Sequence, residues 1–189
     1  MKKTVGFAVT GSHCTFPRLK TALEELCGEF EVIPILSREA AADSRFMGGA
    51  DLMRMLESVT GRAPVTTVGE AEPIGPKKLL DLLIICPCTG NTAAKIALGI
   101  TDGPVTMAFK AHVRNSRPVL LSVSTNDGLG ANAQNIGRLM NTKNVFFVPF
   151  GQDDPENKPC SVTADLKKLV PAAKMALESK QLQPVITSL

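Results

Sequence analysis

Tryptophan and tyrosine are both absent from this 189-residue sequence, whose large aromatic side chains are eight phenylalanines. Histidine is also scarce, since it occurs only as His13 and His112. The spacing of the two excludes the His-Glu-x-x-His motif of zinc hydrolases. The Gly-x-Ser-x-Gly turn of serine hydrolases is missing as well. The common hydrolase classes are therefore not indicated.

Cysteine gives no sign of a disulfide framework or a metal site. Five cysteines occur, an odd number, and no secretory signal precedes them, which favours reduced thiols. Cys86 and Cys88 form a C-x-C rather than the C-x-x-C of zinc and redox sites, and we predict no bound metal. Cys27 and Cys86 are interpreted as small buried hydrophobic residues.

Strong charge and long apolar runs are absent too. Lys and Arg number 21 against 18 Asp and Glu, and no run of basic residues exceeds two. A net charge of +3 is too weak to indicate nucleic acid or an anionic membrane as a partner. The most apolar stretch, 79–88, contains Asp81 and is interrupted by Pro87, so it falls short of the ~20 residues of a membrane span. The sequence thus favours a cytoplasmic protein.

Apolar runs alternate with helical patterns along the whole chain. The runs are nearly continuous in apolar character, which is typical of parallel strands covered on both faces. We predict strands at 4–10, 31–36, 82–86, 119–123 and 145–148, and helices at 17–27, 49–60, 92–98, 104–115, 129–140 and 163–180. Residues 61–76, rich in Pro and Gly, are expected to be an extended connection. The prediction is a single α/β domain over 1–189: three αβα layers around a doubly wound, Rossmann-like, mainly parallel sheet.

Ligands of such sheets bind beside the carboxyl ends of the strands, so the residues just past each strand matter most. Gly11 and Ser12 follow the first strand, where a helix start favours an anion such as a phosphate. Ser37 follows the second strand, and it either binds a ligand or caps a turn. Thr89-Gly90-Asn91-Thr92 and 122–128 are two further polar loops. Together the four loops predict one binding edge.

Catalytic candidates are few. His13 lies beside the first polar loop, where it is either an acid–base group or a loop histidine without a catalytic role. Cys14 follows it and is a candidate reactive thiol at a helix start. His112 stands between Lys110 and Arg114 in a helical stretch and is interpreted as a surface or subunit-interface residue.

Residues 87–104 resemble a signature of the flavoprotein superfamily. Proline, a small polar loop, Asn91-Thr92, an Ala/Lys helix, Gly99 and Asp102 follow in the order found in that group. Its members include the homo-oligomeric flavin-containing cysteine decarboxylases and the flavin prenyltransferases. The Thr-Gly-Ser start at 10–12 and the serine after the second strand are similar too, and the resemblance extends from Thr4 to about Pro149.

The resemblance implies an FMN pocket and an assembly of three subunits or a multiple of three, with the flavin near a subunit boundary. Matched by position, Asn126 would face the substrate or the flavin edge. The residues implied to face FMN are Gly11, Ser12, Ser37, Thr89, Gly90, Asn91 and Thr92. Because Trp and Tyr are absent, only Phe, Met, aliphatic side chains or a neighbouring subunit can cover the isoalloxazine ring.

The segment 122–155 is most similar to one branch of that superfamily. Each member of this branch is one of the two subunits of an oxidoreductase. This resemblance implies a partner A subunit that binds NAD(P), and a small dicarboxylate substrate. The chain itself has only one glycine of a dinucleotide fingerprint, which agrees with such a division. A stand-alone flavin enzyme and a non-catalytic assembly subunit remain alternatives.

Three departures from the wider superfamily concern catalysis. Pro73 takes the place of the decarboxylases' catalytic histidine, and proline has no proton to transfer. Ser124 takes the place of an arginine of the prenyltransferases. Asn126 matches the asparagine of the decarboxylases' Pro-x-Met-Asn motif, but Val123 and Thr125 replace its Pro and Met. The same loops also suit a dicarboxylate, since helix N-termini favour anions.

Overall fold

The computed structural model describes residues 2–188. Five strands pair in parallel in the order β2-β1-β3-β4-β5 within the described residues. They are β1 (Thr4–Val9), β2 (Glu31–Leu36), β3 (Leu82–Cys88), β4 (Val119–Thr125) and β5 (Val145–Phe147). Their side chains are largely buried, and those of the central β3 are buried throughout. The predicted Rossmann-like, mainly parallel sheet is confirmed.

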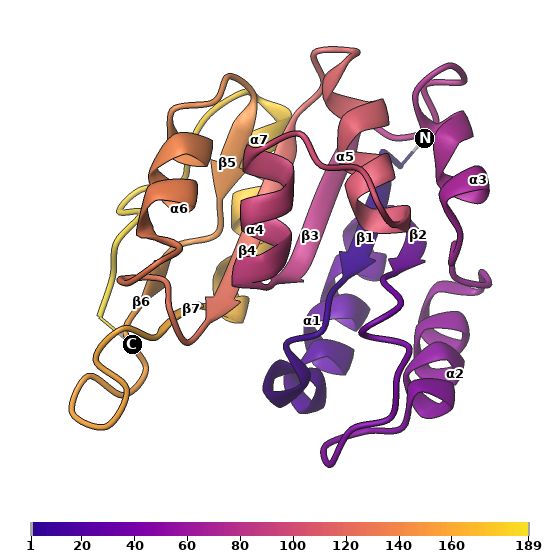
Figure 1. Ribbon diagram of the computed structural model, residues 1–189. Coiled ribbons are helices and arrows are strands. Elements are labelled where there is room, and N and C mark those ends of the chain that lie inside the picture. Colours follow the sequence, from indigo (N-terminus) through magenta and orange to yellow (C-terminus); the bar gives the residue numbers. More distant parts are fainter. Residues whose placement is uncertain (1, 189) are drawn as a thin grey trace.

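Helices cover both faces of the sheet in three layers (Figure 1). On one face lie α1 (Phe16–Glu29) and α7 (Leu169–Leu177), and α2 (Gly49–Thr60) packs against α1 and β2. On the other lie α4 (Gly90–Ala97), α5 (Pro104–Val113) and α6 (Ala133–Met140). The chain moves outward from β1 to β2 and then crosses back to β3. The strand order therefore reverses between β1 and β3, where ligands bind in sheets of this kind.

A short antiparallel extension was not anticipated from the sequence. β7 (Val162–Ala164) pairs with the end of β4, where Ser124 is opposite Thr163, and β6 (Phe150–Gly151) pairs with β7. The C-terminal helix expected at 163–180 is correspondingly shorter. Its first residues belong to β7 and to the 3-10 helix η3 (Leu166–Lys168), and α7 follows. Pairing with β4 overrides the helical pattern there.

Other segments also differ from expectation, among them the helix predicted at 129–140, which begins at Ala133. The connection at 61–76 contains α3 (Val68–Ala71) and the 3-10 helix η2 (Glu72–Ile74). α3 begins with a capping box, in which Thr67 Oγ1 accepts from Glu70 N at 3.2 Å and Glu70 Oε2 accepts from Thr67 N at 3.0 Å. β3 continues through Pro87, where its register with β4 shifts, because proline has no N–H to donate.

The described helices include none that is both long enough and apolar enough to cross a membrane. Nor do His, Cys, Asp and Glu of residues 2–188 gather in any group of three that is suited to a metal ion.

Candidate functional site

The point where β1 and β3 end side by side is fixed by one buried hydroxyl. Thr10 Oγ1 donates to the carbonyl of Pro87 at 2.6 Å and accepts from the N–H of Thr89 at 3.1 Å. The Thr10 residue is 1% exposed. It therefore holds the start of α4 against the loop that follows β1.

The start of α4 is organised by Thr89, the N-cap. Its Oγ1 accepts from the N–H of Thr92 at 3.2 Å and donates to Thr92 Oγ1 at 3.0 Å. The cap satisfies one N–H group of the first turn, and the N–H groups of Gly90 and Asn91 have no acceptor within the helix. This end of the helix carries a partial positive charge, which suits an anion or a hydrogen-bond acceptor.

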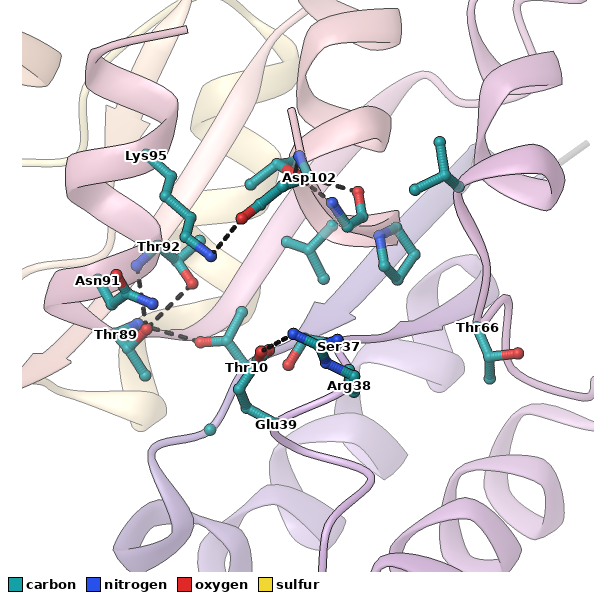
Figure 2. Close-up of a pocket in the computed structure, with 16 residues that line it drawn as sticks. Thr10, Ser37, Arg38, Glu39, Thr66, Thr89, Asn91, Thr92, Lys95 and Asp102 are labelled. Carbon is teal, nitrogen blue, oxygen red and sulfur yellow. Dashed lines mark hydrogen bonds and ion pairs between the residues drawn. The ribbon is translucent and has the colours of Figure 1, made fainter. Parts of the chain in front are cut away.

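A first cavity of about 370 Å³ opens in front of these residues (Figure 2). Hydroxyl side chains of Thr10, Ser37, Thr66, Thr89, Thr92 and Thr106 line it, together with the apolar Val68, Pro104 and Val105. Its charged side chains are already paired. Lys95 Nζ lies 2.7 Å from Asp102 Oδ2, and Arg38 Nη2 lies 3.7 Å from Glu39 Oε1. The Lys95 ammonium holds the pKa of Asp102 below its usual value.

This set of residues fits FMN. The volume lies within the range of cofactor pockets, and the lining combines hydroxyl groups with apolar side chains. The helix start at Thr89 suits a phosphate or a polar ring edge. The apolar wall is aliphatic, so it would cover one face of an isoalloxazine ring without aromatic stacking.

A second hollow, of about 580 Å³, lies on the other side of the Thr89 loop. Gly11, Thr89 and Asn91 belong to both cavities, so the two adjoin. The second hollow is formed by residues after β1, β3 and β4 and by the segment 153–163, whose loop extends from the body in Figure 1. It includes Ser12, His13, Cys14, Asn126 and three cationic side chains, Arg18, Arg45 and Lys158.

The predicted site residues are thus divided between two neighbouring cavities. Ser37 and Thr92 line the first, whereas Ser12, Gly90, His13, Cys14 and Asn126 line the second. Their places after successive strands predict one edge of the sheet, but the order of residues along the chain does not separate the two cavities. Arg18, Arg45 and Lys158 were not predicted as site residues. They come from α1, from the loop at 37–48 and from the segment 153–163, and no local sequence pattern indicates that these three parts lie together.

Both site glycines face protein rather than empty space. A Cβ on Gly90 would lie 2.5 Å from Asn132 Nδ2 and 2.7 Å from Asp127 Oδ1. A Cβ on Gly11 would lie 3.2 Å from Cβ of Glu39. Gly90 therefore allows the 125–132 loop to pack on α4, and the loop is fixed because Asp127 accepts from Thr125 Oγ1 at 2.5 Å and from Asn132 Nδ2 at 2.7 Å.

Ser12 belongs to a cluster of three hydroxyls. Its Oγ lies 2.9 Å from Ser124 Oγ, and Thr15 Oγ1 lies 3.1 Å from Ser124 Oγ and 3.3 Å from Ser12 Oγ. Ser124, the residue that replaces the prenyltransferase arginine, thus has a structural partner on the opposite loop. The cluster joins the loop after β1 to β4 beside the second hollow.

His13 is the candidate acid–base group with the clearest geometry. Its ring packs edge-on against Phe16, with centroids 4.9 Å apart. Its Nδ1 is buried, and the described residues offer it no hydrogen-bond partner. A buried nitrogen without a partner is costly, so packing alone does not explain the position of this ring. Cys14 is exposed, with its Sγ 3.7 Å from Ser12 Oγ. Asn126 is exposed at the rim.

Cys86, Cys88 and the second histidine are buried in the fold. Burial raises the pKa of Cys86 and of Cys88 to about 12, so neither is a thiolate at neutral pH. His112, expected at the surface or at an interface, is 1% exposed in the chain and its Nε2 donates to the carbonyl of Pro118 at 2.9 Å. Cys27 is only partly buried, unlike Cys86.

Comparison with known proteins gives consistent results. The model of the family described as Flavoprotein matches residues 1–176. The chain is 46% identical over 186 residues to the B subunit of dipicolinate synthase from Bacillus subtilis (strain 168), a match that covers 97% of this chain and 93% of the relative. The crystal structure of the corresponding B subunit from Bacillus halodurans C superposes with a TM-score of 0.90 at 40% identity, covering 100% of this chain and 99% of the other.

More distant structures share the fold. The FMN-dependent cysteine decarboxylase SpaF matches with a TM-score of 0.65 at 21% identity, over 95% of this chain and 97% of that one. At that identity the likeness concerns the arrangement of strands and helices alone.

Proposed function

The chain belongs to the flavoprotein family, and on that basis we propose that it acts as the B subunit of a dipicolinate synthase. In this role it works with an A subunit to oxidise a dihydrodipicolinate-type precursor to dipicolinate. The full-length similarity to two B subunits is the observation that carries the proposal. The two adjoining cavities at the carboxyl edge agree with it, because they provide separate places for a cofactor and a small substrate.

The first cavity is the proposed FMN site. Thr10, Ser37, Thr89 and Thr92 would hold the polar parts of the cofactor, and Val105 with its apolar neighbours would pack on the ring. FMN supplies a two-electron acceptor when bound. This chain's own part is to bind and orient it, and to exclude water with the aliphatic wall.

The second cavity is the proposed substrate site. Oxidation of the dihydro ring removes a hydride, which NAD(P)⁺ on the A subunit finally accepts, and a proton. His13 is the proposed proton acceptor, because it lines this hollow and the described residues engage neither of its ring nitrogens in a hydrogen bond. Asn126, at the rim, is the proposed hydrogen-bond donor to the substrate or the flavin edge. Because the chain lacks a dinucleotide fingerprint, NAD(P) is assigned to the partner.

The family resemblance extends the proposal to assembly and location. We expect one domain per chain, several copies per assembly in a multiple of three, and action in the cytoplasm of the mother cell of a spore-forming bacterium. Light scattering of the purified chain tests the number of copies.

The decisive experiment compares turnover by the A subunit alone, this chain alone, and both together. Dipicolinate formation and NAD(P)H formation should appear in equal amounts, and only when both are present. Titration with FMN should quench the flavin fluorescence. Full turnover by the A subunit alone would reduce this chain to an assembly subunit.

A stand-alone flavin enzyme, either a decarboxylase or a prenyltransferase, is the alternative. Pro73 lies in η2 and offers no proton, and Ser124 is engaged by Ser12 and Thr15. Release of CO₂ from a cysteine-terminated peptide by the isolated chain would favour this alternative and contradict the proposal.

A further inference from the structure

The two cavities differ in how their charges are balanced. In the first, both cationic side chains, Lys95 and Arg38, have a carboxylate partner. In the second, Arg18 and Arg45 form neither an ion pair nor a side-chain hydrogen bond with any residue between 2 and 188. The second hollow therefore contains guanidinium groups whose charge is not balanced by the chain.

The carboxylates of the second hollow are already engaged elsewhere. Both oxygens of Asp127 accept hydrogen bonds from its own loop, as described above. Asp153 Oδ1 accepts from Ser161 Oγ at 2.9 Å, and its Oδ2 lies 3.9 Å from Lys158 Nζ. Asp127 is thus engaged within its own loop, and Asp153 is engaged by Ser161 and Lys158. Neither acid pairs with Arg18 or Arg45, so the two arginines are free for a ligand.

The position of Arg18 is unfavourable for a purely structural side chain. It lies in the first turn of α1, a 14-residue helix whose first turn has no acidic residue and whose N-cap, Thr15, makes no side-chain cap bond. Cations are favoured at the opposite end of a helix, because the N-terminus already carries a partial positive charge. An anion bound beside Arg18 would compensate both charges.

Arg45 adds a second cation from a different segment, together with a flat apolar surface. It lies in the connection between β2 and α2, and its guanidinium stacks on the ring of Phe46 with 4.8 Å from Cζ to the centroid. Phe46 lines the same hollow and is 42% exposed, which is unusual for a large aromatic side chain. The hollow thus offers two carboxylate-binding groups and a surface for a ring.

We propose that the second hollow binds a small flat dicarboxylate, with Arg18 and Arg45 as the residues that bind its carboxylates. Guanidinium groups bind carboxylates through two parallel hydrogen bonds, a geometry that a lysine does not provide. His13 lines the same hollow, so its ring and the two arginines border the space that the dicarboxylate would occupy. The inference rests on the proposed function, and it names the side chains that select that function's substrate class.

The test measures binding of dipicolinate by calorimetry to the chain and to the variants Arg18→Gln and Arg45→Gln. Picolinate, which has one carboxylate, is the comparison ligand. Arg138→Gln is the matched control, because Arg138 is an exposed arginine on α6 outside both cavities. FMN affinity of each variant reports whether the fold and the first cavity are intact.

We expect the wild type and Arg138→Gln to bind dipicolinate at least tenfold more tightly than picolinate. Each cavity variant should lose about tenfold in dipicolinate affinity, retain FMN affinity, and lose the preference for two carboxylates. Cavity variants that bind dipicolinate as tightly as the wild type would overturn the inference, and so would a wild type that does not distinguish the two ligands.

Kinetics with the A subunit separate this inference from the proposed function. If the two-subunit enzyme turns over and Arg18→Gln and Arg45→Gln leave KM unchanged, the inference fails and the function stands. If binding follows the expected pattern but the two subunits together form no dipicolinate, the function fails and the dicarboxylate site stands.

Discussion

The hydroxyl oxygens of Ser12 and Ser124 lie 2.9 Å apart although 112 residues separate them in the chain. Ser12 follows β1, Ser124 is the residue before the last of β4, and β3 lies between these strands in the sheet. Their contact therefore spans the end of β3 and connects the loop after β1 to the last residues of β4. Replacing either hydroxyl tests how far that connection stabilises the site.

Ser124→Ala should lower the free energy of unfolding by about 1 kcal/mol, because it removes two hydrogen bonds from a mostly buried cluster. Ser12→Ala should cost less, since Ser12 is more exposed. Urea unfolding of both single variants and the double variant gives the coupling, expected at about 0.5–1 kcal/mol. Ser58→Ala, on the exposed face of α2, is the control and should be neutral or slightly stabilising. Additive effects at 12 and 124 would contradict the contact.

Thr10→Val should be the more damaging change. Valine keeps the shape of threonine but loses the bonds to the Pro87 carbonyl and the Thr89 N–H, and both groups are left without this partner. We expect a loss of about 2 kcal/mol in unfolding free energy, together with weaker FMN binding because Thr89 is no longer fixed. Thr21→Val on the exposed side of α1 is the matched control. If Thr10→Val bound FMN as tightly as the wild type, the Thr10 hydroxyl would not be needed to position Thr89 for the cofactor.

Two glycine-to-alanine changes should have opposite signs. Gly90→Ala forces its Cβ into the Asn132–Asp127 pair, so we expect destabilisation of about 1–3 kcal/mol. Gly137→Ala lies in α6, where a Cβ meets nothing within 4 Å, and should stabilise by about 0.5–1 kcal/mol. Thermal unfolding of the two variants side by side checks the signs. If Gly90→Ala changed thermal stability in the same direction and to the same extent as Gly137→Ala, the 125–132 loop would have to move easily to accommodate a Cβ at position 90.

Stability should fall in mild acid because of His112. Burial lowers its pKa to about 4, against its ordinary value of 6.5, even though the bond to Pro118 opposes the shift. Between pH 4 and 6.5, His112 is protonated in the unfolded chain but neutral in the folded one, so the free energy of unfolding rises with pH. The stability that depends on neutral His112 is complete above pH 6.5 and is lost as the pH falls toward 4. The slope should approach about 1.4 kcal/mol per pH unit within this window.

Urea unfolding between pH 4 and 7 measures that slope. His112→Gln, whose amide N–H₂ can still donate to the Pro118 carbonyl, should remove it while changing neutral-pH stability less. A variant with the same acid dependence as the wild type would assign the effect to other groups.

The sheet and most helices could be predicted because their signals are local. β2 and α2 begin and end at the predicted residues. α2 stops before Gly61, whose φ of 68° lies in the left-handed region that glycine adopts readily. β6 and β7 could not be predicted, since strands this short exist only through pairing with a distant partner. α3 carried a readable Thr67-x-x-Glu70 capping box that the surrounding prolines and glycines obscured.

The edge of the sheet that carries the candidate site could be predicted from the sequence, but its division into two cavities could not. Polar residues after parallel strands indicate the edge where ligands bind, and the loops at 11–12 and 89–92 do lie there. Whether a residue such as Gly90 faces ligand or protein depends on the 125–132 loop, which packs against it through contacts distant in sequence. The unbalanced charge of Arg18 and Arg45 likewise becomes visible only when the hollow is assembled.

The double pairing of β4 limits how related chains can be recombined. Its first residues pair with β5 and its last two pair with β7, so the end of β4 takes its neighbour from a segment about 40 residues later. A chimera that exchanges 119–125 without 150–164 pairs β4 of one protein with β7 of another. It therefore alters the wall of the second hollow even when every residue of the first cavity is unchanged. The two segments form one exchangeable unit, and breakpoints placed between them should yield chains that retain FMN affinity but lose ligand selectivity.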